Sequence, residues 1–340
     1  MAEPVNRAAA PAVYPAVMVL LGLVLVGLAL ASITQGSSDI GIGKIYDAFF
    51  AFDGSRDHLV IASIRVPRVL AGILAGAALA SAGAVMQAMA HNPLASPDLL
   101  GINAGAAFSV VVALSILGIV SQAALVWWAF FGAASAAATV YLFGASGWGN
   151  ATPLKLVLAG AVLNAFLFSV TTAILVYDRN TLDAVRLWTA GSLVGRNMED
   201  VSAVAPYIFT GLAAAILFSR QLTTMSMGMT MARSLGQSPA IWRCLAVVLV
   251  VLLAGGSVAL AGPIGFVGLV MPHLVRMCVG GDYRWVVPFC AMGGALLVLL
   301  ADTLGRTLFG NQAFPVGVTM ALVGAPFFIW LARRRIGSIA

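Results

Sequence analysis

The stretch PRVLAGILAGAALASAGAVMQAM, residues 67–89, decides the fold class of this chain. It is almost entirely apolar, and about 20 such residues are enough for a helix to cross the hydrocarbon core of a bilayer. Its many glycines and alanines are typical of membrane helices, where small side chains let neighbouring backbones approach closely. The stretch therefore predicts a membrane-spanning helix packed tightly among others.

The rest of the chain has the same character. Hydrophobic residues make up 61% of the 340 residues, and charged residues only 9%. A soluble domain is nearer 45–50% apolar and about 25% charged. A water-soluble fold cannot hide this much apolar surface, so lipid must be the solvent. We expect an all-α polytopic membrane protein with no soluble catalytic domain.

Apolar runs divide the chain into about ten expected transmembrane helices. They lie at 15–33, 67–89, 100–119, 122–143, 153–176, 201–218, 241–260, 264–278, 286–304 and 316–332. We expect a cytoplasmic tail over 1–14 and a single transmembrane domain over 15–340. Within that domain, an outer loop covers 34–64 and an inner segment covers 228–243.

The distribution of basic residues favours a cytoplasmic location for both termini. With that topology, ten of the 18 Lys and Arg residues lie on the inner side, including the cluster Arg333-Arg334-Arg335, and eight lie on the outer side. The asymmetry is modest, so it favours this topology without requiring it. An even number of spans also permits two inverted halves of about five helices, an arrangement common in transporters.

Three arginines stand near the predicted outer ends of helices. Arg65 and Arg68 flank a proline, and Arg306 follows Asp302 by four residues. One interpretation is that Arg65 and Arg68 are interfacial anchors and that Arg306 forms a local pair with Asp302. The other is a docking point for acidic residues of a soluble partner, because Arg forms bidentate pairs with carboxylates. The residues alone leave both interpretations open.

The inner stretch MGMTMARSLGQSPAIWR, residues 227–243, contains no acidic residue. Gly236, Ser238 and Pro239 break it into two short pieces. These pieces fit a pair of amphipathic helices lying on the membrane surface. They equally fit a platform on which a cytoplasmic subunit sits.

Several catalytic signatures are missing from the sequence. It has no G-x-x-x-x-G-K-[ST] loop for a nucleotide, and its three histidines and three cysteines show no metal-ligand or disulfide spacing. The net charge of +6 is scattered and does not require nucleic acid. We expect no cofactor, no bound metal and no enzyme activity. Helix centres also lack carboxylates, with Asp302 the nearest exception, which disfavours an ion-coupled secondary transporter.

Eight stretches in register resemble the FecCD-type permeases, membrane subunits of ATP-binding-cassette importers. They are RVPR at 65–68, GAALASAGAVMQ at 76–87, NPLASPDLLG at 92–101, WTAGSL at 188–193, ARSLG at 232–236, ALAGPIGFVGLVMPH at 259–273, LADTLGR at 300–306 and PVGVTMALVGAPFFIW at 315–330. The resemblance implies a type II importer permease fold of ten helices. It also implies a bacterial inner-membrane location and a permease dimer, either of two identical chains or with a paralogous chain.

The resemblance also implies partners and cargo. A periplasmic or lipoprotein binding protein would dock at Arg65, Arg68 and Arg306, and a cytoplasmic ATPase dimer would supply the energy. Residues at the family's ATPase-coupling positions are Gly228, Arg233, Leu235, Gly236 and Arg243. Met229 departs from the acidic residue common there in the family. The motif wording is most similar to permeases for ferric siderophores of the citrate or hydroxamate type, with haem or cobalamin as alternatives.

Overall fold

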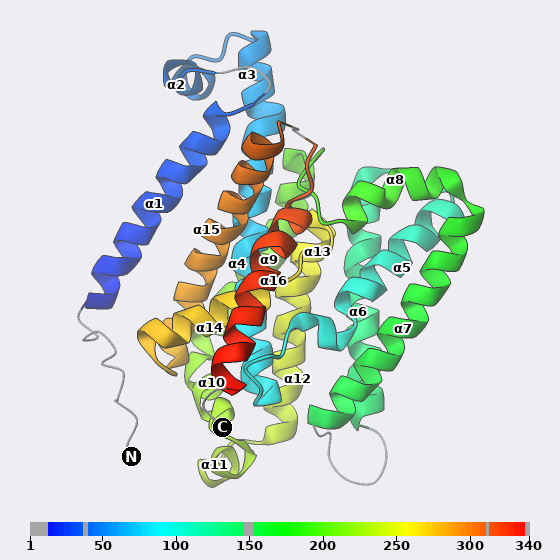
Figure 1. Cartoon of the computed structure of the whole chain (residues 1–340), viewed down its shortest axis with the longest axis vertical. Coiled ribbons are helices and arrows are strands. Elements are labelled where there is room, and N and C mark those ends of the chain that lie inside the picture. Colours follow the sequence, from blue (N-terminus) through cyan, green and yellow to red (C-terminus); the bar gives the residue numbers. More distant parts are fainter. Residues whose placement is uncertain (1–12, 37–39, 146–152, 311–312, 337–340) are drawn as a thin grey trace.

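The computed structural model describes residues 13–36, 40–145, 153–310 and 313–336. These residues form helices joined by short loops, and no strand occurs among them. Figure 1 shows the long helices running roughly side by side between two ends. One end carries α2 and α3, and the other carries α10 and α11. The expectation of an all-α protein is confirmed.

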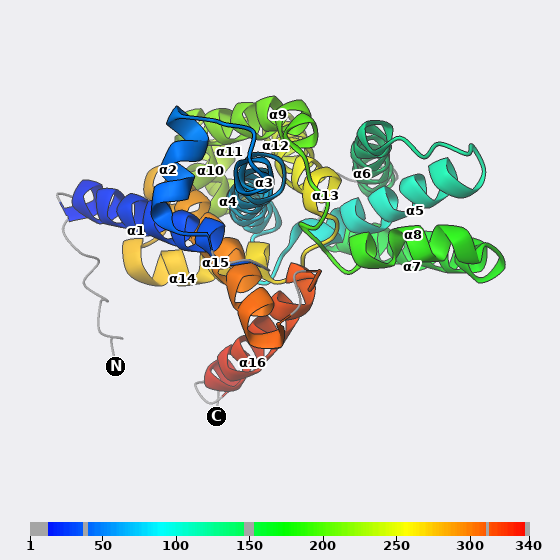
Figure 2. The same ribbon diagram turned by 90° about the horizontal axis from the view of Figure 1, so that it is seen from above.

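Helix α4, Val66–Ala90, lies at the centre of the larger group of helices (Figure 2). Almost every side chain in it is buried, because its glycines and alanines let other helices approach from several sides. The helices that pack against it are α9 (Met198–Leu217), α12 (Pro239–Val250), α13 (Gly256–Ala261), α14 (Val267–Val279) and α15 (Tyr283–Phe309). The stretch that decided the fold class is therefore the core of the molecule.

Two long helices flank this group. Helix α1, Tyr14–Thr34, packs along α15, and α16, Val316–Ile336, also contacts α15. Helix α1 begins and α16 ends towards the α10–α11 end (Figure 1). The first and last long helices therefore have their outermost ends on the same side of the molecule.

A second group of helices stands beside the first (Figure 2). It consists of α5 (Ile102–Ser115), α6 (Gln122–Ala145), α7 (Pro153–Tyr177) and the short α8 (Arg179–Thr189). Helix α6 connects the groups through its contacts with α13 and with the π-helical turn Val251–Gly255 between α12 and α13.

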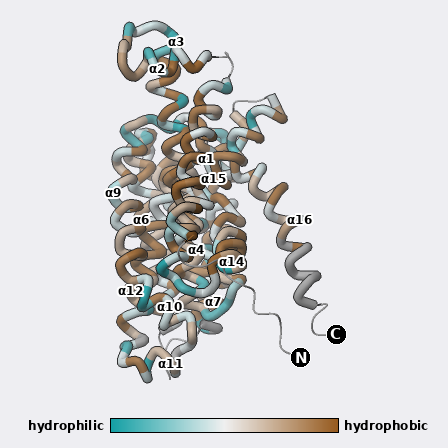
Figure 3. Tube along the Cα trace, turned by 90° about the vertical axis from the view of Figure 1, so that its left-hand side faces the viewer, coloured by the Kyte–Doolittle hydropathy of each residue, from teal (hydrophilic) through white to brown (hydrophobic). Residues whose placement is uncertain are grey.

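Short helices occupy the two ends of the bundle. Helix α2 (Ile42–Phe50) and α3 (Arg56–Val60) lie at one end, and α10 (Ser219–Ser226) and α11 (Met229–Ser234) lie at the other (Figure 1). A 3-10 turn, Pro97–Leu100, links α4 to α5. Along the molecule in Figure 3, hydrophobic positions dominate the long helices, and hydrophilic positions concentrate near these ends. This distribution fits a molecule whose middle lies in lipid.

Each of the ten predicted segments lies on a helix. Within the described residues, seven helices are long and apolar enough to cross a membrane, and three shorter apolar helices, Ile102–Ser115, Val267–Val279 and Val316–Phe327, occupy the remaining predicted positions. The predicted count of ten spans and the two inverted halves stay predictions. One boundary was wrong. The second predicted helix begins at Arg56 rather than residue 67, because α3 continues through the π-helical turn Ile61–Arg65 into α4.

The predicted outer loop, 34–64, therefore contains two helices. The predicted tail is outside the described residues except for its last two, Val13 and Tyr14. The side chains of Met229 and of Arg333, Arg334 and Arg335 also lie outside the description.

Glycines mark the closest approaches between helices. A Cβ added at Gly76 of α4 would overlap the backbone of Gly294 in α15, and one added at Gly294 would overlap Gly76. A Cβ added at Gly83, about two turns further along α4, would overlap the backbone of Gly268 in α14. These contacts confirm the expectation that glycine serves helix–helix packing, since only the absence of a side chain allows backbones to touch.

Candidate functional site

The structure brings the three predicted docking arginines together at the α2–α3 end. Arg68 forms a two-pronged contact with Asp302, with Nη2 to Oδ1 at 2.8 Å and Nε to Oδ2 at 3.0 Å. Arg306 Nε lies 3.1 Å from Asp302 Oδ2. The Asp302 carboxylate of α15 thus contacts Arg306 of the same helix and Arg68 of α4. A two-pronged contact between arginine and a carboxylate is a strong charge-assisted hydrogen bond.

The same arginines secure the end of α1. Arg65 Nη1 donates to the carbonyl oxygens of Ile33 at 2.6 Å and Thr34 at 2.9 Å. Arg306 Nη2 donates to Ser32 Oγ at 2.6 Å. Because the last carbonyls of a helix have no partner within the helix and carry partial negative charge, a cation placed there is stabilising. The cluster therefore joins α1, α4 and α15.

All three arginines are buried, with 5–8% of each exposed, and Asp302 is 2% exposed. The local pair of Arg306 with Asp302, one of the two interpretations of Arg306, is present. Asp302, the exception noted in the sequence, lies about two turns before the end of α15. Its contacts with two arginines are those of a structural ion pair. Docking by these arginines stays a prediction.

The predicted coupling segment lies at the α10–α11 end and is largely exposed. Arg233 is exposed, and Leu235 is 62% exposed at the turn after α11. Gly228 and Gly236 have φ values of 107° and 77°, in the region that favours glycine, and they set the turns before and after α11. Arg243, by contrast, is buried within α12. The structure therefore presents four of the five predicted residues at one exposed corner.

The two short helices at this end are α10 and α11. Helix α11 lies in the first of the two predicted pieces, and α10 precedes it in the chain. The second predicted piece is instead the start of α12, which continues through the bundle. Helix α10 was missed because SRQLTTMS, residues 219–226, is too short and too polar to register as an apolar run. Its polar residues directly after the 201–218 run are the signal that could have revealed it.

Helix α10 is fixed to two long helices. His91 Nε2, just after α4, lies 2.7 Å from the carbonyl oxygen of Met225. The backbone N–H of Tyr283, at the start of α15, donates to Thr223 Oγ1 at 3.0 Å. A displacement of α10 would consequently reach both α4 and α15.

A polar groove of about 670 Å³ runs beside α10. It is lined by Arg220, Thr223, Ser226, Met227, Gly281, Asp282 and Arg284. Asp282 caps α15 and pairs with Arg284, with Nη2 to Oδ2 at 2.6 Å. The sequence did not connect the two sides of this groove, residues 220–227 and 281–284, because they are about 60 residues apart in the chain.

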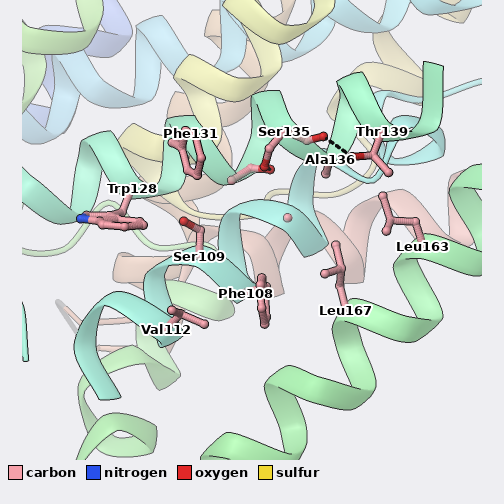
Figure 4. A pocket seen from close by; sticks show the side chains of 12 residues that line it. Phe108, Ser109, Val112, Trp128, Phe131, Ser135, Ala136, Thr139, Leu163 and Leu167 are labelled. Atoms are coloured by element: carbon pink, nitrogen blue, oxygen red, sulfur yellow. Dashed lines mark hydrogen bonds between the residues drawn. The ribbon is translucent and has the colours of Figure 1, made fainter. Parts of the chain in front are cut away.

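A smaller cavity of about 190 Å³ lies among α5, α6 and α7 (Figure 4). Its lining is mostly apolar, with Phe108, Trp128 and Phe131 around it and Ser109, Ser135 and Thr139 as its hydroxyl groups. Thr139 Oγ1 donates to the carbonyl oxygen of Ser135 at 2.7 Å. The hydroxyls of Ser135 and Thr139 thus serve the helix backbone, that of Ser109 has no hydrogen-bond partner among the described residues, and no charged side chain lines the cavity. Among the described residues no group of three His, Cys, Asp or Glu side chains gathers to hold a metal.

The molecule is a bundle of apolar helices with glycine crossings. It has a buried ion-pair cluster at one end and a short-helix platform at the other, which is the arrangement of a membrane transport subunit. The architecture is that of a solved inward-facing metal-chelate type ABC transporter, with a TM-score of 0.82 and 28% identity over 94% of this chain and 99% of that one. Residues 23–334 match the FecCD transport family, and the chain belongs to that family.

Two curated relatives from Bacillus subtilis (strain 168) extend over nearly the same length. The chain is 41% identical to the probable siderophore transport system permease protein YfiZ, covering 94% of this chain and 96% of that protein. It is 42% identical to the Fe(3+)-citrate import system permease protein YfmD, covering 89% of this chain and 90% of that protein. The family resemblance inferred from the eight motifs is therefore confirmed.

Proposed function

We propose that this chain is the permease subunit through which an ABC importer moves a ferric siderophore of the citrate or hydroxamate type into the cytoplasm. The observation that carries the proposal is likeness along nearly the whole chain to permeases named for siderophore and ferric citrate transport. The absence of a phosphate-binding loop from the sequence supports a transport subunit that hydrolyses no ATP itself.

The ATPase dimer docks, in this proposal, at the α10–α11 end. Support comes from the exposed apolar side chains Met227, Met231 and Leu235 beside the exposed Arg233. Flexible methionines suit a surface that must stay in contact while its partner changes shape. Because α10 is bonded to the ends of α4 and α15, movement of the ATPase would pass directly to the central helices.

The coupling surface can be tested by Leu235→Asp. We expect the variant to retain the wild-type Tm, since Leu235 is exposed, and to lose binding to the ATPase subunits by roughly tenfold or more through loss of an apolar contact and addition of a charge. Ile42→Asp on α2, also exposed, is the matched control at the other end. Equal loss in both variants, or in neither, would contradict docking through Leu235.

The binding protein docks, in this proposal, at the α2–α3 end, with Arg65, Arg68 and Arg306 contributing charge. Their position near the end of the bundle supports the proposal, and their burial means that they act chiefly by holding the shape and potential of that surface. Changing Arg65 and Arg68 to Glu should weaken binding-protein docking, more strongly at low salt. A folded variant with unchanged affinity would return these arginines to a purely structural role.

The whole proposal has one direct test. The chain is reconstituted in proteoliposomes, as a homodimer or with a paralogous permease, together with its ATPase and binding protein, and ⁵⁵Fe-siderophore uptake is measured. We expect uptake that requires ATP and both partners. Uptake by the chain alone, driven by an ion gradient, would instead make it a secondary transporter. Uptake of haem or cobalamin but no ferric siderophore would support an importer permease with a different substrate from the one proposed.

A further inference from the structure

A buried arginine lines a cavity that the transport proposal does not use. Arg196, in the loop between α8 and α9, is 8% exposed. It borders a cavity of about 230 Å³ formed by the ends of α5 and α6, by α8 and by α13. Gln122, Trp188 and Val185 are among the other side chains that line it. The cavity lies near the end of the bundle that carries α8 (Figure 1).

The guanidinium of Arg196 is only partly occupied by protein groups. With its amide oxygen turned towards the arginine, Gln122 accepts from Nη1 and Nη2 at 2.8 Å each. Nε is buried and has no hydrogen-bond partner among the described residues. A buried N–H without an acceptor is costly, and more so on a charged group. Nε–H is therefore an unsatisfied donor on a side chain that lines the cavity.

The nearest carboxylate does not neutralise Arg196 by direct contact. Asp200 attracts the charge of Arg196, but in the described part of the chain no ion pair within 4 Å joins them. The Asp200 carboxylate instead belongs to the N-terminal cap of α9, where its Oδ2 accepts from the Asn197 N–H at 3.4 Å, and its Oδ1 has no hydrogen-bond partner among the described residues. Burial lowers the pKa of Arg196 from its ordinary value, which shows that the surrounding protein withholds solvent from the charge.

From these contacts we infer that the cavity beside Arg196 binds a carboxylate group carried on a compact carbon body. A guanidinium suits a carboxylate, which accepts in the plane of the arginine fork. Gln122 takes one N–H from each Nη of Arg196, so three of the five guanidinium N–H groups are not used by Gln122. The apolar remainder of the wall, including Val185 and Trp188, suits the carbon body of such an acid.

The carboxylate could belong to a free organic acid or to an iron chelate, and the second source rests on the proposed function. The probe is citrate, titrated calorimetrically into the full chain in lipid nanodiscs, once iron-free and once as ferric citrate. We expect saturable citrate binding. Competition by ferric citrate assigns the site to a chelate, and its absence assigns the site to a free acid.

The decisive variant is Arg196→Gln, which should weaken citrate binding about 10- to 100-fold, the range expected for one charge-assisted hydrogen bond. Arg186→Gln is the matched control, because Arg186 is an exposed arginine on α8 outside the cavity. It should bind citrate as the wild type does. Equal weakening in both variants would show general charge attraction and overturn the site.

A second variant protects the test against misfolding of Arg196→Gln. Ala184→Phe fills the cavity from α8 while leaving Arg196 in place, and it should abolish binding. Unchanged citrate affinity in Ala184→Phe, no citrate binding to the wild type, or sulfate binding as tight as citrate would each overturn the assignment. The assay contains neither ATPase nor binding protein, so its failure leaves the proposed transport function standing, and failed uptake leaves the site standing.

Discussion

At the scale of single residues, the Asp302 carboxylate compensates the buried positive charges of Arg68 and Arg306 at the α2–α3 end. Its side chain is 1% exposed and contacts both Arg68 and Arg306. Removing one partner of a buried ion pair leaves an uncompensated charge, whereas the intact pair roughly balances its own desolvation. The cluster is therefore more important for the arrangement of α1, α4 and α15 than for net stability.

We predict that Asp302→Asn lowers the free energy of unfolding by about 3–5 kcal/mol, because it leaves Arg68 and Arg306 together without their carboxylate. Arg68→Gln should cost less, since Asp302 keeps Arg306. Thermal unfolding in detergent measures both. Asp183→Asn is the control, because its pair with Arg186 is exposed and spans 3.6 Å, so that loss should be below about 1 kcal/mol. Similar losses for Asp183→Asn and Asp302→Asn would contradict the structural role.

Asp98, in the turn between α4 and α5, is the residue with a clear pH signature. Withdrawal from solvent raises the pKa of its carboxyl from 3.8 to about 6, although Asn103 donates to it. A raised folded-state pKa means that the folded protein holds the proton more tightly than the unfolded chain does. Stability should therefore fall as pH rises from about 4 to about 6, and then level off.

Asp98→Asn should remove this dependence and, at pH 7.5, be more stable than the wild type by on the order of 2 kcal/mol. The asparagine keeps an acceptor for Asn103, so the hydrogen bond survives. Melting curves of both proteins between pH 4.5 and 8 give the comparison. The gap between the two Tm values should shrink towards low pH. A gap that is constant across this range would mean that Asp98 is not the titrating group.

At the scale of elements, the glycine crossings set how closely helices meet. Gly83 on α4 faces Gly268 on α14, and Gly76 faces Gly294 on α15. Since the contact at each crossing is backbone against backbone, a new methyl group cannot be accommodated by turning a side chain. The helices themselves would have to separate.

Gly83→Ala should destabilise the protein by about 1–3 kcal/mol, the range for overpacking in a tight core. Gly27→Ala in α1 is the matched substitution, because nothing lies within 4 Å of the added Cβ. It should be neutral or slightly stabilising through helix propensity. Tm values of the two variants in the same detergent decide the matter, and an unchanged Tm for Gly83→Ala would show that the crossing is loose.

At the scale of the whole molecule, the two ends differ in chemistry. The α10–α11 end carries Lys155, Arg220, Arg233, Arg276 and Arg284 with few acidic residues, whereas the basic residues of the other end are accompanied by acidic ones such as Asp53, Asp57 and Asp302. Excess basic charge marks the cytoplasmic side of a membrane protein. We therefore propose that this end faces the cytoplasm, that both termini are cytoplasmic, and that the protein lies in a bacterial inner membrane.

Cysteine labelling tests this orientation. In a background with Cys244 and Cys278 changed to Ser, Ser234→Cys on α11 and Asn180→Cys on α8 each add one exposed thiol, while Cys290 stays buried. A membrane-impermeant maleimide added from the periplasmic side should label Asn180→Cys directly. Ser234→Cys should react only after permeabilisation. The opposite pattern would invert the topology.

Properties that depend on local composition were determined by the sequence alone. Apolar runs located the long helices and α14, because the length and hydropathy of a span must match the bilayer whatever its neighbours are. This criterion missed α8 and α10, because one face of each helix is polar. It also missed the extension of α4 back to Arg56, because there the helix leaves the apolar region.

Contacts between distant segments were decided only by the tertiary structure. Arg68 and Asp302 are 234 residues apart, and no spacing rule indicated that they meet, or that Arg196 is buried beside Gln122. Such pairs depend on which helix faces touch, and that depends on where glycines permit close approach. The small side chains of residues 67–89 made that packing possible, whereas the partners of each face became known only with the folded bundle.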